Sequence, residues 1–246
     1  MHEVDQTRPV LVGVHGWLLS SRLWGPLSRE LSPHWSLLGL DLPGFGKRPR
    51  PRGLAPNLAS YGRWLAETLR QELGDQPIIL VGHSLGGSVV LHAADLLDGQ
   101  IVGLIQIAAG GGVYQPRPFA QLRKGGAAFL RWRPSWLSFW PGTQSIRTPL
   151  QADLRAAQGL LVCSTSRGAV KQLPRLTAEL KVPNLWIAGG RDQVMAARYV
   201  CHLAGYSHLH QVKVMHQAGH LPMCQMPRLL AVAMQDWLEE VITPAQ

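Results

Sequence analysis

Residues 78–87 read Ile-Ile-Leu-Val-Gly-His-Ser-Leu-Gly-Gly. The apolar start of this stretch is typical of a buried strand, and the residues after Ser84 turn amphipathic, as a helix does. Gly82 and Gly86 flank the serine, because a strand that reverses sharply into a helix leaves no room for side chains beside the turn. The pattern predicts a strained turn that presents the Ser84 hydroxyl at the edge of a sheet, as a nucleophile requires. The alternative is a plain turn between a strand and a helix.

Strand-like and helix-like runs alternate along the chain on both sides of this turn. Besides the run before Ser84, strands are expected at residues 10–14, 37–42, 102–108, 184–188 and 210–215. Helices are expected around residues 23–31, 58–73, 85–97, 195–203 and 227–241. Short connections between alternating elements indicate a parallel sheet with helices on both faces. We predict an α/β fold of about six parallel strands, whose functional residues gather at the carboxyl ends of the strands.

The composition fits a single globular unit. The 246 residues are 46% hydrophobic and 16% charged, which is enough to form a large core. No run approaches the roughly 18 apolar residues of a membrane span, and residues 1–9 lack the apolar centre of a secretory signal. The three cysteines are scattered and form no metal-binding or disulfide pattern. Free thiols are typical of a reducing compartment, so we expect a cytoplasmic protein.

The net charge of +9 comes from residues 113–175, which we call the insert. Its only acid is Asp153, against ten basic residues: Arg117, Arg123, Lys124, Arg131, Arg133, Arg147, Arg155, Arg167, Lys171 and Arg175. Residues 1–112 and 176–246 are expected to form the core, and the insert follows the fourth predicted strand.

The aromatic residues of the insert suggest the apolar wall of a ligand site. We predict that Phe129, Trp132 and Trp136 bind substrate. About half of the insert's aromatics are expected to form its own core instead. The excess of basic residues favours an anionic partner, such as an acidic carrier protein, a coenzyme A thioester or an anionic membrane surface. A solvated surface is the alternative. Nucleic acid is not expected, because no nucleic-acid-binding motif accompanies the charge.

Ser84, Asp192 and His220 each follow a predicted strand. A serine hydroxyl needs a base to take its proton, and a histidine base needs a carboxylate to hold its tautomer. The order Ser, Asp, His along the chain is the one that accompanies a Gly-x-Ser-x-Gly turn. We prefer His220 to its rival His216, which falls directly at the end of a strand. For Asp192, a helix N-cap is the structural alternative.

A second turn, His15-Gly16-Trp17, follows the first predicted strand. We predict that the backbone N–H groups of Trp17 and Leu85 bind the oxyanion that forms during acyl transfer, and that His15 contacts the substrate. A tight turn without a catalytic part is the alternative.

Together these motifs resemble those of the α/β-hydrolase family. The resemblance rests on residues 14–17 (Val-His-Gly-Trp), 41–46 (Asp-Leu-Pro-Gly-Phe-Gly) and 82–87, with Gly190-Arg191-Asp192 and Gly219-His220. It is strongest to small carboxylesterases, including those that demethylate pimeloyl-carrier-protein esters. The insert also resembles uncharacterised cyanobacterial hydrolases, more weakly. Members usually begin with an antiparallel hairpin, which we expect to be absent here because only nine residues precede the first strand.

The resemblance implies a serine hydrolase that cleaves a carboxylic ester or thioester with an apolar acyl or alcohol group through an acyl-enzyme, without a metal or organic cofactor. It also implies that the insert, residues 113–175, is a helical cap over Ser84. The same scaffold supports other reactions, so two alternatives remain. One is a lyase or acyltransferase that uses the same three residues. The other is a receptor that binds a ligand without catalysis.

Overall fold

The computed structural model describes residues 8–32, 34–110, 116–133 and 147–242. The strands are β1 Val10–Val14, β2 Leu37–Leu40, β3 Ile78–His83, β4 Ile101–Ile107, β5 Asn184–Gly189 and β6 His210–Met215. The α-helices are α1 Gly25–Leu31, α2 Leu58–Leu73, α3 Leu85–Ala94, α4 Pro116–Trp132, α5 Arg147–Gln151, α6 Leu154–Ser164, α7 Arg167–Ala178, α8 Ala197–Ala204, α9 Pro222–Gln225 and α10 Pro227–Ile242. Short 3₁₀ turns cover Ser21–Trp24 and Asp95–Leu97.

The strands form one parallel sheet in the order β2-β1-β3-β4-β5-β6. The predicted six-stranded parallel sheet is therefore confirmed. The second strand ends at Leu40, two residues earlier than predicted, and the backbone N–H of Leu42 donates a hydrogen bond to the His15 side chain instead. Residues 1–7, on which the prediction of a missing hairpin bears, lie outside the described residues.

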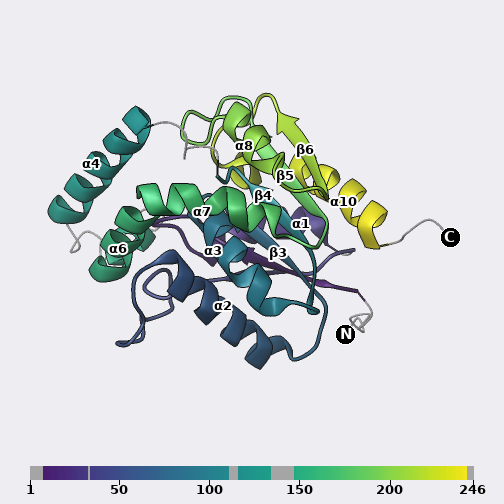
Figure 1. Ribbon diagram of the computed structural model, residues 1–246, viewed down its shortest axis with the longest axis horizontal. Coiled ribbons are helices and arrows are strands. Elements are labelled where there is room, and N and C mark those ends of the chain that lie inside the picture. Colours follow the sequence, from purple (N-terminus) through teal and green to yellow (C-terminus); the bar gives the residue numbers. More distant parts are fainter. Residues whose placement is uncertain (1–7, 33, 111–115, 134–146, 243–246) are drawn as a thin grey trace.

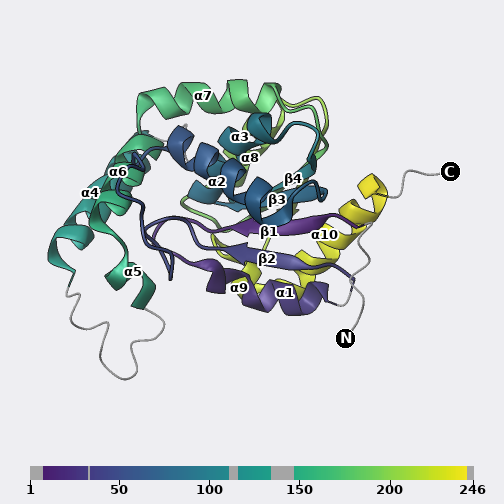
Figure 2. The ribbon, with the colours of Figure 1, turned by 90° about the horizontal axis from the view of Figure 1, so that it is seen from below.

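Helices cover both faces of the sheet (Figures 1 and 2). Helices α1, α9 and α10 lie on one face, and α2, α3 and α8 lie on the other. Each face has its own apolar core, and every residue of β3 and β5 is buried. Strands covered on both faces need continuous apolar sequences, which explains why these two runs stand out in the sequence.

The strand order reverses between β1 and β3. The chain goes from β1 outward to β2 and then returns to the other side of β1 as β3. Val14 at the end of β1 pairs in register with Gly82 near the end of β3. The turns that follow these two strands therefore lie side by side, at the position where open α/β sheets bind their ligands.

Helices α4 to α7 belong to the insert. Helices α4, α5 and α6 lie together at one end of the molecule, and α7 returns to pack against α3 (Figures 1 and 2). Asp153 connects this region to the turn after β2: its N–H donates to Gly44 O at 2.7 Å, and its carboxylate accepts from Arg50 Nε at 3.0 Å. Helix α7 continues three residues past the predicted boundary, to Ala178. None of the described helices is long and apolar enough to span a membrane.

Candidate active site

Ser84 has a strained backbone at the junction of β3 and α3. Its φ is 52° and its ψ is −117°, in the positive-φ region that non-glycine residues rarely adopt. The flanking glycines allow the turn: a Cβ on Gly82 would lie 2.5 Å from the Cα of Gly87, and a Cβ on Gly86 would overlap the carbonyl oxygen of Val14. The sharp turn predicted from the sequence is therefore present, and its geometry explains both glycines.

A chain of hydrogen bonds connects Ser84 with Asp192 through His220. The Nε2 atom of His220 lies 3.1 Å from Ser84 Oγ, and its Nδ1 atom lies 2.8 Å from Asp192 Oδ2. The structure thus brings together the three residues that follow β3, β5 and β6. His216, the rival of His220, is exposed on the turn after β6.

The carboxylate of Asp192 determines which nitrogen of His220 carries the proton. The Asp192 side chain is fully buried, and a carboxylate only accepts hydrogen bonds, so Nδ1 of His220 donates to it. The Nε2 atom of a neutral ring is then free to accept a proton from Ser84. Burial alone raises the pKa of Asp192, but hydrogen bonds from His220 and from the N–H groups of Met195 and Val194 outweigh it and lower the pKa overall.

His83 is a further residue of the site, which the sequence analysis did not single out. Its Nε2 atom donates to the carbonyl oxygen of His220 at 2.8 Å and thereby holds the loop that carries His220. Burial, followed by the nearby His220, lowers the pKa of His83 to about 3, so the ring is neutral at pH 7. The sequence shows only that a histidine directly precedes the serine. It does not reveal the hydrogen bond of His83, because the partner of His83 lies 137 residues away along the chain.

The turn after β1 lies directly against Ser84. A Cβ placed on Gly16 would lie 2.8 Å from His83 Nδ1 and 3.2 Å from the Cβ of Ser84, so a glycine suits this close approach. Trp17 and Leu85 both line the cavity in front of the serine. Within the described part of the chain, neither of their backbone N–H groups donates a hydrogen bond. Two free N–H donors beside a serine hydroxyl can stabilise a developing negative charge.

His15 does not lie on the cavity wall, so the structure corrects its prediction as a substrate-binding residue. It is fully buried, and both ring nitrogens have backbone partners: Nδ1 donates to Gly16 O at 2.8 Å and Nε2 accepts from Leu42 N at 3.0 Å. Burial lowers the pKa of His15 to about 4, which fits this neutral tautomer. Because a trans peptide points its C=O and N–H in opposite directions, the bond to Gly16 O also fixes the direction of the Trp17 N–H.

A cavity of about 310 Å³ opens in front of Ser84. Its walls are mainly apolar and come from the core turns, from the loop around Val194 and Met195, and from α4, α6 and α7 of the insert. The side chains of the insert that line it are Leu122, Leu161, Ser164, Thr165 and Leu173. A volume of this size is at the small end of the range of ligand pockets and fits a short apolar group.

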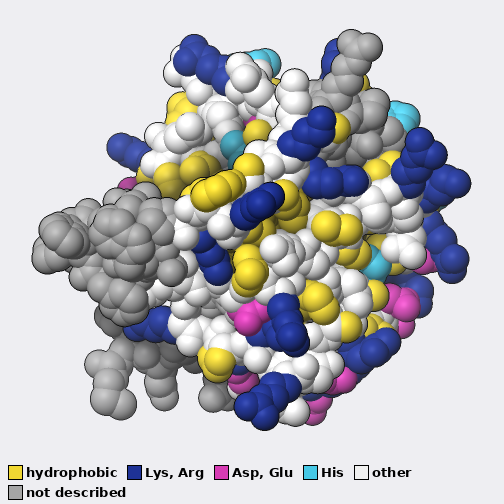
Figure 3. Space-filling view, turned by 90° about the vertical axis from the view of Figure 1, so that its left-hand side faces the viewer, with side chains coloured by type: hydrophobic (Ala, Val, Ile, Leu, Met, Phe, Trp, Pro, Cys, Tyr) yellow, Lys and Arg dark blue, Asp and Glu magenta, His cyan; other side chains and the backbone are white. Residues whose placement is uncertain are grey.

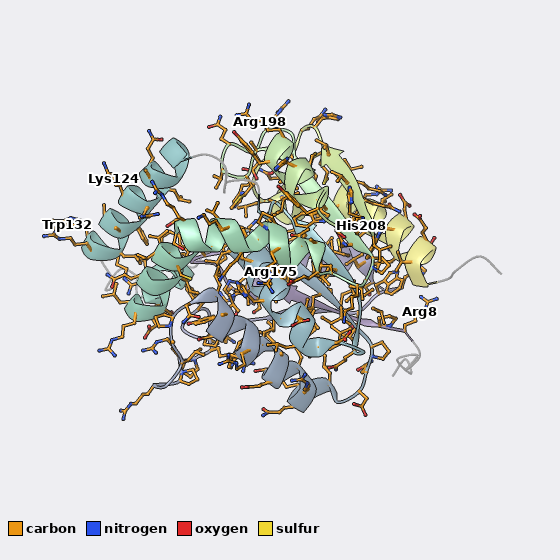
Figure 4. All side chains as sticks on the ribbon, in the orientation of Figure 1. Arg8, Lys124, Trp132, Arg175, Arg198 and His208 are labelled. Carbon is orange, nitrogen blue, oxygen red and sulfur yellow. The ribbon has the colours of Figure 1, made fainter. Side chains whose placement is uncertain are left out.

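The structure does not place the predicted aromatic residues on this cavity. Phe129 is 38% exposed and Trp132 is 77% exposed, and Trp132 points away from the molecule at the outer end of α4 (Figure 4). Trp136 lies outside the described residues. The inner side of α4 is instead formed by Leu122, Gly126 and Leu130, spaced four residues apart, and Gly126 lies close to the indole ring of Trp17. The sequence shows the periodicity of α4 but not which side faces inward.

The site offers a base next to a hydroxyl, two free backbone donors and an apolar cavity. Among the residues that the structure describes, no cluster of three or more His, Cys, Asp or Glu side chains could hold a metal ion. The base, the hydroxyl and the two backbone donors support attack by the serine on a carbon that develops an oxyanion.

Comparison with known proteins identifies the family of this chain. A family model described as the alpha/beta hydrolase family matches residues 11–233. The pimeloyl-[acyl-carrier protein] methyl ester esterase of Xanthomonas oryzae pv. oryzae is 29% identical over 95% of this chain and 96% of its own length. The protein of the same name from Xanthomonas axonopodis pv. citri is 30% identical over the same shares.

Solved structures show the same fold with more distant sequences. A thermophilic esterase from Thermogutta terrifontis superposes with a TM-score of 0.77 over 96% of this chain and 92% of its own, at 24% identity. A bromoperoxidase from Bacillus anthracis gives a TM-score of 0.80 over 95% and 92%, at 17% identity. These two proteins share a fold but have different names, so the fold alone does not define the reaction, which must be argued from the site. On the match of the family model to nearly its whole length, this chain belongs to the alpha/beta hydrolase family.

Proposed function

We propose that this protein is a serine hydrolase that cleaves carboxylic esters or thioesters through an acyl-enzyme. The observation that supports it most is the hydrogen-bonded chain from Asp192 through His220 to Ser84, at the edge of an apolar cavity. Relatives that match almost the full chain are named esterases. In this proposal Ser84 is the nucleophile, His220 the general base and acid, and Asp192 the residue that orients His220.

The proposed reaction has two halves. In the first, His220 Nε2 takes the proton of Ser84 while Oγ attacks the carbonyl carbon, and the N–H groups of Trp17 and Leu85 bind the oxyanion. The tetrahedral intermediate then breaks its bond to the alcohol or thiol, which leaves with the proton from His220. In the second half, His220 deprotonates a water molecule, which attacks the acyl-enzyme. The tetrahedral intermediate then releases the carboxylic acid as Ser84 Oγ leaves and takes the proton back from His220.

We propose that the insert is a cap that selects the substrate. It contributes apolar side chains to the cavity, and the bond between Asp153 and Arg50 attaches it to the core beside the site. The name of the Xanthomonas relatives suggests a substrate class, an ester of an acyl group carried by an acyl-carrier protein. A small apolar ester group would occupy the cavity, while the carrier would remain outside. The free thiols fit a cytoplasmic location.

The charge on the insert supports an anionic carrier. Its described basic side chains are largely exposed, and its only acid, Asp153, is paired with Arg50 of the core. Figure 3 shows the end of the molecule that carries α4 and α6, where Lys and Arg side chains lie between hydrophobic ones. Such a surface attracts an acidic protein over a distance of about one Debye length, roughly 10 Å at 0.1 M salt.

Hydrolysis of a carrier-bound ester should therefore depend on salt. Raising the salt concentration from about 20 mM to about 500 mM is expected to lower kcat/KM for an acyl-carrier-protein ester by about tenfold, and to leave a small neutral ester unchanged. Lys124→Glu on α4 should reduce the salt dependence, whereas Arg29→Glu on α1, on the far side of the sheet from α3, should not. Equal salt dependence for both substrates would contradict docking through the insert.

Labelling by a fluorophosphonate probe tests the proposed chemistry, because the probe reacts only with an activated serine. We expect stoichiometric labelling of Ser84, none in the Ser84→Ala variant, and hydrolysis that depends on chain length across p-nitrophenyl esters and acyl-coenzyme A thioesters. A folded protein that binds these esters but resists the probe would indicate a receptor. Transfer of the acyl group to an added alcohol in preference to water would indicate an acyltransferase.

A further inference from the structure

Ser88 lies on α3, four residues beyond the proposed nucleophile. Its side chain lines the cavity, and the residue is only 8% exposed. Among the residues that the structure describes, its hydroxyl has no hydrogen-bond partner. The hydroxyl faces the cavity and is not fully enclosed, so water can supply its hydrogen bonds and a ligand group can replace that water.

The other hydroxyls on the cavity wall differ from Ser88 in this respect. Thr165 donates to Leu161 O at 2.6 Å and accepts from Arg123 Nε at 2.9 Å. Ser164 also donates to Leu161 O, at 3.4 Å. Both hydroxyls bond to groups of the insert, so Ser88 is the hydroxyl of this wall that remains available to a substrate.

The local backbone also leaves Ser88 free. A serine within a helix commonly donates to the carbonyl oxygen four residues earlier, which here belongs to Ser84. That oxygen already accepts the N–H of Gly87 at 3.0 Å, in the turn that follows the serine. The described structure shows no bond from the Ser88 hydroxyl to that carbonyl oxygen, so the hydroxyl keeps both its donor and its acceptor capacity for a ligand.

We propose that Ser88 is a specificity-determining residue that binds a second oxygen atom of the substrate. This proposal rests on the proposed function, since Ser84 must attack the reacting carbonyl. Four residues of helix span about 6 Å, so the recognised oxygen lies a few bonds from the scissile carbonyl carbon. The substrate class is an ester whose chain carries an ether, keto or hydroxyl oxygen at that distance. Leu85, Leu161 and Leu173 of the same wall hold the carbon atoms around it.

The test compares p-nitrophenyl hexanoate with its oxa analogues, in which one CH₂ group at a time is replaced by an ether oxygen. The measured quantity is the ratio of kcat/KM for each analogue to that for hexanoate. Ser88→Ala is expected to lower this ratio by about fivefold to tenfold at one oxygen position, which corresponds to a single hydrogen bond. Hydrolysis of hexanoate itself should stay within about twofold of the wild type.

Ser164→Ala is the matched control, because it removes a hydroxyl of the same cavity that already has a protein partner. The ratio should not change in this variant. A ratio that Ser88→Ala leaves unchanged at every oxygen position would overturn the proposal, while an active wild type would still support esterase activity. A wild type that hydrolyses none of these esters would remove the proposed function and this inference together.

Discussion

Replacement of Ser84 by Ala is expected to lower kcat/KM for p-nitrophenyl esters by about 10⁴- to 10⁶-fold, the loss typical of removing a serine nucleophile. The physical reason is that no other hydroxyl lies within hydrogen-bond distance of His220 Nε2 in the described residues. The activity that remains would come from the cavity and the backbone donors alone. Initial rates over a range of substrate concentrations measure the effect, with Ser28→Ala on α1 as a serine control away from the cavity.

Ser84→Gly separates the loss of chemistry from a loss of folding. The φ of 52° is unfavourable for a serine and costs a glycine almost nothing. The variant should therefore be as inactive as Ser84→Ala. Its free energy of unfolding should exceed that of the wild type by about 1 kcal/mol, because the relief of backbone strain outweighs the entropy that a glycine adds to the unfolded chain. Urea unfolding gives this value. An inactive and destabilised glycine variant would mean that the turn is not strained in solution.

The elements that the sequence predicted well are those whose signal is local. Strand β3 is a continuous apolar run because both of its faces are covered, and the glycines beside Ser84 are required by contacts within a few residues of the turn. Asp192 and His220 could be predicted for a related reason. Residues that follow parallel strands must meet at one edge of the sheet, whatever their separation along the chain.

The parts of the site that the sequence did not reveal depend on distant partners. His15 turns into the core because it accepts the N–H of Leu42, and His83 holds the carbonyl of His220. Neither contact follows from spacing. The sequence also did not predict which side of α4 faces the core. A helix with apolar residues around much of its circumference can pack on either side. Here the contact between Gly126 and Trp17 determines the inward side. Phe129 and Trp132 therefore face outward.

Replacement of Asp192 by Asn is expected to lower kcat by about 10⁴-fold and to leave KM nearly unchanged. Asn has the same shape, and its Oδ1 can still accept from the N–H groups of Val194 and Met195. Its amide, however, donates toward Nδ1 of His220, where the carboxylate accepts. The imidazole would then carry its proton on Nε2 and direct an N–H at Ser84 Oγ, so it could not take the proton of the serine.

The dependence of stability on pH tests whether Asp192 is ionised in the folded protein, as this role requires. The pKa of Asp192 is lowered in the folded state, so its ionised carboxylate stabilises the fold fully above the unfolded value of about 3.9. That contribution is lost as the pH falls through the lower folded pKa. The difference in Tm between wild type and Asp192→Asn should thus shrink from pH 7 to pH 3. Asp98→Asn is the control: it removes an exposed partner of Lys181, and its Tm should stay close to that of the wild type at pH 7.

The activity of the same variant decides the catalytic role. A kcat of Asp192→Asn within tenfold of the wild type would show that the carboxylate does not set the tautomer of His220.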